Sequence, residues 1–302
     1  MNNGFVKQSL AVRIFKAFNL LFMLFIIVVM LFPYLNVLAK ALNQSSDTIM
    51  GGITIFPRKF TLENFAVILG EKTMKSSVIV SVMRVVTGVL MGLIIQFSCG
   101  YAMTRKFPGK GIVLTLFTIP MFISAGQIPT YVLFSKDSLL NNFWVYVLPG
   151  LFNFFNVILI RTFIQATIPE SLFEAASIEG ANEVKIFSRI VIPLCMPIMA
   201  TIALWLMVGH WNDWITTLLY IRKASLFTLQ YRMMELVKES ERIQKMIAAA
   251  LQSGQVVNVS AAPTSESLIA AQVIITTIPI IMVYPFLQKY FVKGIMLGAV
   301  KG

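Results

Sequence analysis

The chain offers few side chains of the types and spacing that covalent chemistry requires. Its single histidine, His210, stands three residues before Asp213, and its two cysteines, Cys99 and Cys195, lie outside any C-x-x-C pair. A zinc site needs three or four protein ligands, and nucleophilic catalysis needs a paired base. We therefore expect no catalytic residues and no metal site, and we interpret both cysteines as packing residues.

A segment rich in turn and capping residues, 167–193, is the strongest candidate for an interaction. Thr167 and Glu170 form a T-x-x-E capping box, and Pro169 suits the first turn of a helix, which predicts a short helix beginning here. Gly180 can supply the positive φ that ends this helix.

Asn182 can then cap a second short helix that stops before Pro193. The first helix is expected to carry two different faces. One face presents Glu170, Glu174 and Ser177, and the other presents Leu172, Phe173 and Ala176. A helix pair with small residues and carboxylates forms a compact knob that suits a partner's groove.

The composition places this knob on a membrane protein. Hydrophobic residues make up 57% of the 302 residues and charged residues only 13%, whereas soluble domains average about 25% charged. The formal charge of +12 suits basic residues beside cytoplasmic headgroups better than nucleic-acid binding.

Six apolar stretches approach the roughly 20 residues that a membrane helix needs. They cover 17–39, 76–103, 112–134 (broken by Pro120), 143–164, 194–220 and 268–286. The sequence thus predicts an all-α polytopic membrane protein with six transmembrane helices. We divide it into 1–75, a helix with an extracellular segment, and 76–302, a core that carries the loop 167–193 and an extracellular segment 222–266.

Basic residues set the orientation of the six helices. They cluster in the N-terminal tail, in the link after the second helix and in the C-terminal tail, at Lys7, Arg13, Lys16, Arg105, Lys106, Lys110, Lys289, Lys293 and Lys301. With six helices all three clusters lie on one side, which predicts cytoplasmic termini. Within the outer segment, residues 228–251 show helical apolar spacing, which predicts an amphipathic helix before breaks at Gly254 and Pro263.

The knob resembles the cytoplasmic signature of type I ABC importer permeases, E-A-A-x-x-x-G followed by nine residues and I-x-L-P. Six of its seven fixed positions match, at Glu174, Ala175, Ala176, Gly180, Ile190 and Pro193. Ile192 replaces the usual leucine, a volume-conserving change.

Further segments resemble the branch of that family that takes up maltose and complex oligosaccharides. They are 60–65 (F-T-L-E-N-F), 101–110 with its Y-A-M-T-R and F-P-G-K pieces, 211–214 (W-N-D-W) and the tail 290–302. In the second segment Gly100 replaces the alanine that normally comes first.

The resemblance implies the type I importer fold and a bacterial plasma-membrane location. It also implies a heterodimer with a second permease, two ATP-binding subunits, an extracellular solute-binding protein and an oligosaccharide substrate. The chain has no G-x-x-x-x-G-K-[ST] phosphate loop, so we expect no cofactor of its own and ATP on the partner subunits. The expected ATPase-coupling residues are Glu170, Glu174, Ala175, Ala176, Gly180, Ile190 and Pro193. Prolines 120, 197, 279 and 285 are candidate kinks for helices that must rock.

Polar residues within the apolar stretches are candidates for the substrate path. They are Arg84, Asn153, Asn156, Asn212 and Asp213. A buried arginine is unfavourable unless it faces a cavity or a partner, and both uses stay open for Arg84. The asparagines lie among phenylalanines that suit a sugar, although interhelical hydrogen bonding is the simpler interpretation.

Three other functions compete with this one. An ABC permease for another small solute would share the signature loop. An ion-coupled secondary transporter would need intramembrane carboxylates, and Asp213 alone lies within a span. An intramembrane enzyme would need a nucleophile and base or a metal set, which the chain lacks.

Overall fold

The computed structural model describes residues 9–123, 125–252 and 265–299, and these fold into helices with one isolated bridge between Asn43 and Phe60. The chain divides into two compact units, residues 1–70 with 236–275 and residues 71–235 with 276–302. Lys7, Gly254, Pro263 and Lys301, which entered the predictions above, lie outside the described residues.

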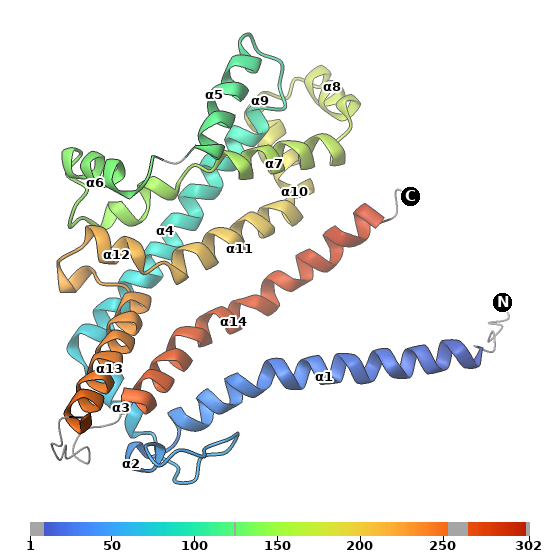
Figure 1. Ribbon diagram of the computed structural model, residues 1–302. Coiled ribbons are helices and arrows are strands. Elements are labelled where there is room, and N and C mark those ends of the chain that lie inside the picture. The colour runs from blue at the N-terminus through green and yellow to red at the C-terminus, as the bar shows by residue number, and fades with distance from the viewer. Residues whose placement is uncertain (1–8, 124, 253–264, 300–302) are drawn as a thin grey trace. The chain divides into compact units, whose positions relative to one another are not determined.

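The elements follow one another along the chain as labelled in Figure 1. The α-helices are α1 Leu10–Ala41, α2 Ser45–Thr48, α3 Glu63–Gly70, α4 Lys72–Ala102, α5 Lys110–Phe122, α6 Gln127–Lys136, α7 Phe154–Thr167, α8 Glu170–Ile178, α9 Glu183–Ile186, α10 Ile192–Leu194, α11 Met196–Asn212, α12 Ile215–Tyr220, α13 Leu229–Gln252 and α14 Ser265–Ala299. Short 3₁₀ turns cover Phe143–Tyr146, Leu148–Gly150 and Ala224–Leu226, and a π-turn covers Phe187–Val191.

Three described helices are long and apolar enough to cross a bilayer, at Leu10–Ala41, Thr73–Ala102 and Glu266–Val283. Three bent helix pairs raise the total to as many as six. The bent pairs comprise α5 with α6, the turns 143–150 with α7, and 183–194 with α11.

The six predicted stretches thus correspond to helices, and the amphipathic helix predicted at 228–251 is confirmed as α13. Three predicted spans are interrupted, among them 143–164, which breaks between Gly150 and Phe154. The stretch 112–134 contains the end of α5 at Phe122, two residues after Pro120, and the stretch 194–220 divides between α11 and α12 at Asp213. By contrast, α14 continues through Pro279 and Pro285.

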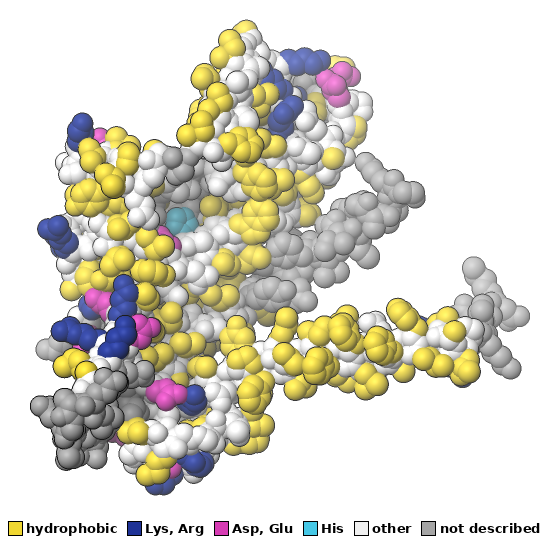
Figure 2. All heavy atoms as spheres, in the orientation of Figure 1, with side chains coloured by type: hydrophobic (Ala, Val, Ile, Leu, Met, Phe, Trp, Pro, Cys, Tyr) yellow, Lys and Arg dark blue, Asp and Glu magenta, His cyan; other side chains and the backbone are white. Residues whose placement is uncertain are grey.

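In the first unit, α1 carries apolar side chains along its whole length, and these are exposed (Figure 2). Exposing such a surface to water is unfavourable, whereas contact with lipid or with another apolar helix is favourable. The turn after α1 is held by a polar cluster in which Asp47 accepts from Asn43 at 3.0 Å and from Arg58 at 2.9 Å. The Asn43 hydrogen bond and the Arg58 charge hold the pKa of Asp47 below its usual value.

In the second unit, α4 packs against α7 and α11 (Figure 1). The core between them is built from buried side chains that include Phe97, Tyr101, Ile160, Ile164, Phe173, Ala176, Ile186 and Ile202. This core extends beneath α8, so the knob predicted from the sequence is anchored to the helix bundle by apolar packing.

Close packing of α4 on α7 depends on Gly100. A Cβ at this position would lie 2.5 Å from Cγ2 and 2.8 Å from Cβ of Ile160, which is fully buried. Glycine therefore allows this close contact, which a larger residue would disrupt. We expect Gly100→Ala to destabilise the folded chain by about 1–3 kcal/mol, because overpacking forces helices apart.

Gly111→Ala is the matched control for this prediction. Gly111 lies inside α5, and no atom lies within 4 Å of the position that a Cβ would take there, so alanine should be neutral or stabilising by up to about 1 kcal/mol. Thermal melting of each variant in detergent checks both. Equal melting temperatures for Gly100→Ala and wild type would contradict the tight contact.

Candidate functional site

The predicted knob is a helix–turn–helix formed by α8 and the continuous helical segment 183–194. Gly180 adopts φ +78°, and the turn closes with Gly180 N–H donating to Ser177 O and Ala181 N–H donating to Ala176 O, both at 3.0 Å. This pair of bonds is the Schellman arrangement that a glycine with positive φ permits. The predicted positive φ of Gly180 at the end of the first helix is confirmed.

The second helix begins as predicted, with the Asn182 side chain accepting from Lys185 N–H at 2.9 Å. It does not stop before Pro193, and that prediction is wrong. The residues Phe187–Val191 form a π-turn in which Ile192 N–H donates to Phe187 O. This wider turn accommodates a proline ring that would clash in a regular α-helix, so the helix continues to Leu194.

The capping box predicted at Thr167 and Glu170 is also wrong. Thr167 is the last residue of α7, whose end is extended by the burial of Ile164 and Ile168. Pro169 occupies the N-cap of α8 without a side-chain hydrogen bond. The capping motif does not form because the apolar face of α7 continues beyond Thr167, which keeps that residue helical.

The two faces of α8 differ in exposure. Phe173 and Ala176 are buried in the core, whereas Glu170, Glu174 and Ala175 are exposed. Leu172, which was expected on the inner face, is 38% exposed. Ala176 can therefore contribute to a docking surface only indirectly, by packing α8 against the core.

The remaining signature residues lie on the second helix of the knob. Ile190 is half-buried and packs on the core, and Pro193 is exposed. Glu174 makes no ion pair with any other described residue. Glu170 approaches Lys106 at 3.6 Å between two largely exposed side chains, which contributes little to stability.

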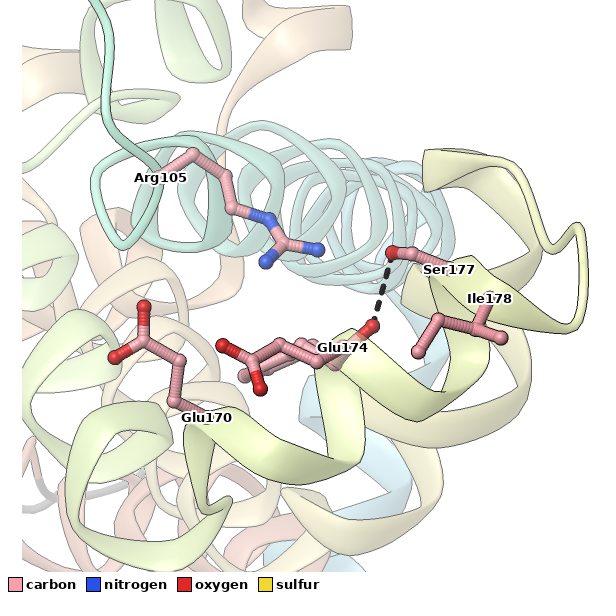
Figure 3. A pocket seen from close by; sticks show the side chains of 6 residues that line it. Arg105, Glu170, Glu174, Ser177 and Ile178 are labelled. Carbon is pink, nitrogen blue, oxygen red and sulfur yellow. Dashed lines mark hydrogen bonds between the residues drawn. The ribbon is translucent and has the colours of Figure 1, made fainter.

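An open groove of about 430 Å³ lies along α8, lined by Arg105, Glu170, Phe173, Glu174, Ser177 and Ile178. Figure 3 shows the carboxylates of Glu170 and Glu174 extending on the Arg105 side of the helix. Glu174 is available to a cation from outside the chain, Glu170 already approaches Lys106, and Arg105 lines the same groove.

Arg105 joins the knob to α4, a role that the sequence reasoning missed. Its guanidinium donates to Glu183 Oε2 at 2.9 Å and to the Tyr101 hydroxyl at 2.7 Å, and it lies 4.4 Å from the Phe173 ring centroid. The Tyr101 hydroxyl also donates to Glu183. Three contacts thus link the end of α4 to both helices of the knob, and charge-assisted bonds of this kind are strong and directional.

Two apolar side chains at the tip of the knob were also missed. Ile178 is 87% exposed and Val184 is 73% exposed. They flank the Gly180 turn, one on each helix. In the sequence, the signal for these two residues was an apolar side chain among charged neighbours in a polar loop. Their exposure favours contact with another protein.

The intramembrane candidates fall into two groups. Asn156 is buried and donates to Gln96 Oε1 at 2.8 Å, so it links α7 to α4. Asn153 caps α7 by accepting from Asn156 N–H, and Asn212 is exposed at the end of α11.

Arg84 and Asp213 form the second group and contact one another. The Arg84 guanidinium bonds to the Asp213 carboxylate and donates to the Asp213 backbone carbonyl at 2.8 Å. Arg84 is 3% exposed and lies 4.6 Å from the Tyr146 ring centroid. The substrate roles of all five candidates stay predictions.

Comparisons with known proteins place these features in a family. No protein-family model matches the chain. Protein LplC of Bacillus subtilis (strain 168) is 33% identical over 298 residues, 98% of each chain. The polygalacturonan/rhamnogalacturonan transport system permease protein YtcP of the same strain is 31% identical, covering 96% of this chain and 99% of that protein.

A crystal structure of a bacterial ABC transporter involved in the import of the acidic polysaccharide alginate contains a chain of the same fold. It superposes with a TM-score of 0.81 at 24% identity, covering 94% of this chain and 99% of that one. The predicted all-α importer-permease fold is confirmed. The chain is a multi-pass membrane protein without catalytic function of its own, and it belongs to the family of permease subunits of ABC importers.

Proposed function

We propose that this permease subunit imports an oligosaccharide and receives its driving force through the knob formed by α8 and residues 183–194. The observation that carries the proposal is the Gly180 turn, where a rigid, core-anchored helix pair presents exposed Ile178 together with Glu174, which pairs with no described cation. Such a tip meets the requirements of a docking surface, namely apolar anchors with a charged rim.

The proposed partners are those that a permease of this family needs. They are a second, homologous permease, two ATP-binding subunits and an extracellular solute-binding protein. The exposed apolar surface of α1 suits contact with lipid or with the second permease. In the proposed orientation, both termini and the knob lie on the cytoplasmic side, where ATP is available.

The substrate class rests on the relatives. YtcP is named for polygalacturonan and rhamnogalacturonan, and another relative, at 27% identity, is named for arabinooligosaccharides. These names share a chemistry of linked sugar units. An oligosaccharide is therefore the substrate that we propose for this chain.

In the proposed mechanism, closure of the ATP-binding subunits moves the knob as one body. Arg105 transmits this movement to α4, because it bonds to Glu183 on the knob and stacks on Phe173. Packed helices switch between discrete arrangements instead of deforming continuously. Rocking of α4 would then open the transport path alternately to either side.

Affinity purification of the tagged chain from native membranes in mild detergent tests this proposal. We expect a second permease and an ATP-binding subunit to co-purify, and cells deleted for the gene to lose uptake of an oligosaccharide. Purification of the chain alone under several gentle conditions, with unchanged sugar uptake, would overturn it.

A further inference from the structure

A second cavity lies between α4, the turns 143–150 and α11, within the same unit as the knob. Its volume is about 360 Å³, and its wall includes Arg84, Tyr146, Trp205, His210, Asp213 and Thr216. Small-molecule sites typically measure about 300–1,000 Å³ and combine apolar walls with a few polar groups.

The polar side of this cavity contains an incompletely bonded guanidinium. Two nitrogens of Arg84 bond to Asp213, but its Nε is buried without a hydrogen-bond partner. A buried donor without a partner is unfavourable by about 1–3 kcal/mol. Arg84 is 3% exposed and lines the cavity, so its guanidinium forms part of the polar wall.

The apolar side is an aromatic platform. Trp205 is 47% exposed and stacks on Phe155 at 6.5 Å between ring centroids, with the planes 19° apart. Phe155 is itself 49% exposed. An aromatic face beside polar groups suits a ligand with an apolar face and a polar edge.

The cavity wall is firmly held. His210 packs so closely on α4 that a Cβ at Gly88 would lie 2.3 Å from its Nε2, and a Cβ at Gly150 would lie 3.4 Å from the same ring. Asp213 is fixed by Arg84 and accepts from Thr216 N–H at 3.1 Å. A preorganised wall loses little entropy when it binds a ligand.

The charges of the cavity select among ligands. The Asp213 carboxylate neutralises Arg84, so the paired groups offer both a donor and acceptors with no net charge. A free carboxylate would be repelled by Asp213, whereas a hydroxyl can accept from Arg84 and donate to Asp213.

We propose that this cavity is a binding subsite for one sugar unit of the substrate, with the ring stacked on Trp205 and its hydroxyls bonded to Arg84 and Asp213. This inference rests on the proposed function, because it requires that the substrate be a carbohydrate. It also implies that the subsite recognises hydroxyl groups and disfavours a sugar unit that carries a carboxylate.

The test compares Trp205→Ala, Trp205→Phe and Trp144→Ala in the complete importer, reconstituted with its binding protein in liposomes. Trp144 is the matched control, since it is 43% exposed and does not line the cavity. The probes are labelled maltotriose, raffinose and trigalacturonate, each measured for uptake alongside the sugar-independent ATPase rate.

For every probe that the wild type transports, we expect Trp205→Ala to lower uptake about tenfold, the loss of one good contact. Trp205→Phe should retain most uptake, and Trp144→Ala and all ATPase rates should stay near wild type. Undiminished uptake by Trp205→Ala would overturn the subsite and leave the importer function standing. A wild-type complex that transports none of a broad sugar panel would overturn the proposed function and the subsite with it.

Discussion

Replacing Gly180 by arginine should reduce uptake by roughly two orders of magnitude, in line with the loss of an interface hot spot. Two effects combine. The φ of +78° costs a residue with a side chain about 1–2 kcal/mol, and the new cation projects from the tip between Ile178 and Val184. No atom lies within 4 Å of a Cβ at this position, so the chain itself should still fold and insert.

Gly109→Arg is a closely matched control. Gly109 also has φ +78° with no atom within 4 Å of its Cβ position, but it lies in the link between α4 and α5. The two variants therefore carry the same backbone strain and the same added charge. Uptake, and capture of the ATP-binding subunit by the tagged chain, are measured for both.

The expected result is loss of the ATP-binding subunit with Gly180→Arg and retention with Gly109→Arg, at equal amounts of each chain in the membrane. Equal capture of that subunit by Gly180→Arg and wild type would show that the knob tip is not the docking surface. Equal losses from both variants would assign the effect to backbone strain.

The second large effect is expected at the Arg84–Asp213 pair. Asp213→Ala removes the counter-ion of a guanidinium that is 3% exposed, and breaking a buried pair from one side costs about 3–5 kcal/mol. It also removes the carboxylate that accepts from Thr216 N–H at the start of α12. We expect a large fall in melting temperature in detergent and a lower amount of folded chain.

A second substitution separates charge from packing in this prediction. Arg84→Met in the Asp213→Ala background removes the unpaired cation and fills similar space, so most of the lost stability should return. Asp213→Asn keeps the size of the side chain and loses its charge. Its melting temperature should lie between those of wild type and Asp213→Ala. Additive destabilisation by Arg84→Met and Asp213→Ala would argue against a stabilising pair.

The sequence predicted what depends on neighbouring residues. Apolar stretches as long as a bilayer indicated the helices, because hydrocarbon admits backbone only when its polar groups bond locally. The Gly180 turn and the Asn182 cap were predicted for the same reason, since each closes hydrogen bonds within five residues. The knob was therefore recognisable before its surroundings were known.

The tertiary structure decided the contacts between residues far apart in the chain. Arg84 meets Asp213 129 positions later, and Arg105 meets Glu183 78 positions later, and no local pattern encodes either pairing. The same long-range packing overrode local signals: burial of Ile164 and Ile168 extended α7 through the capping box at Thr167, and a π-turn carried the helix past Pro193. Residue types and spacing determined that this chain crosses a membrane and forms a helix–turn–helix knob. Packing determined which helix contacts that knob and which polar groups face the cavity, because burial decides the partner of each buried charge.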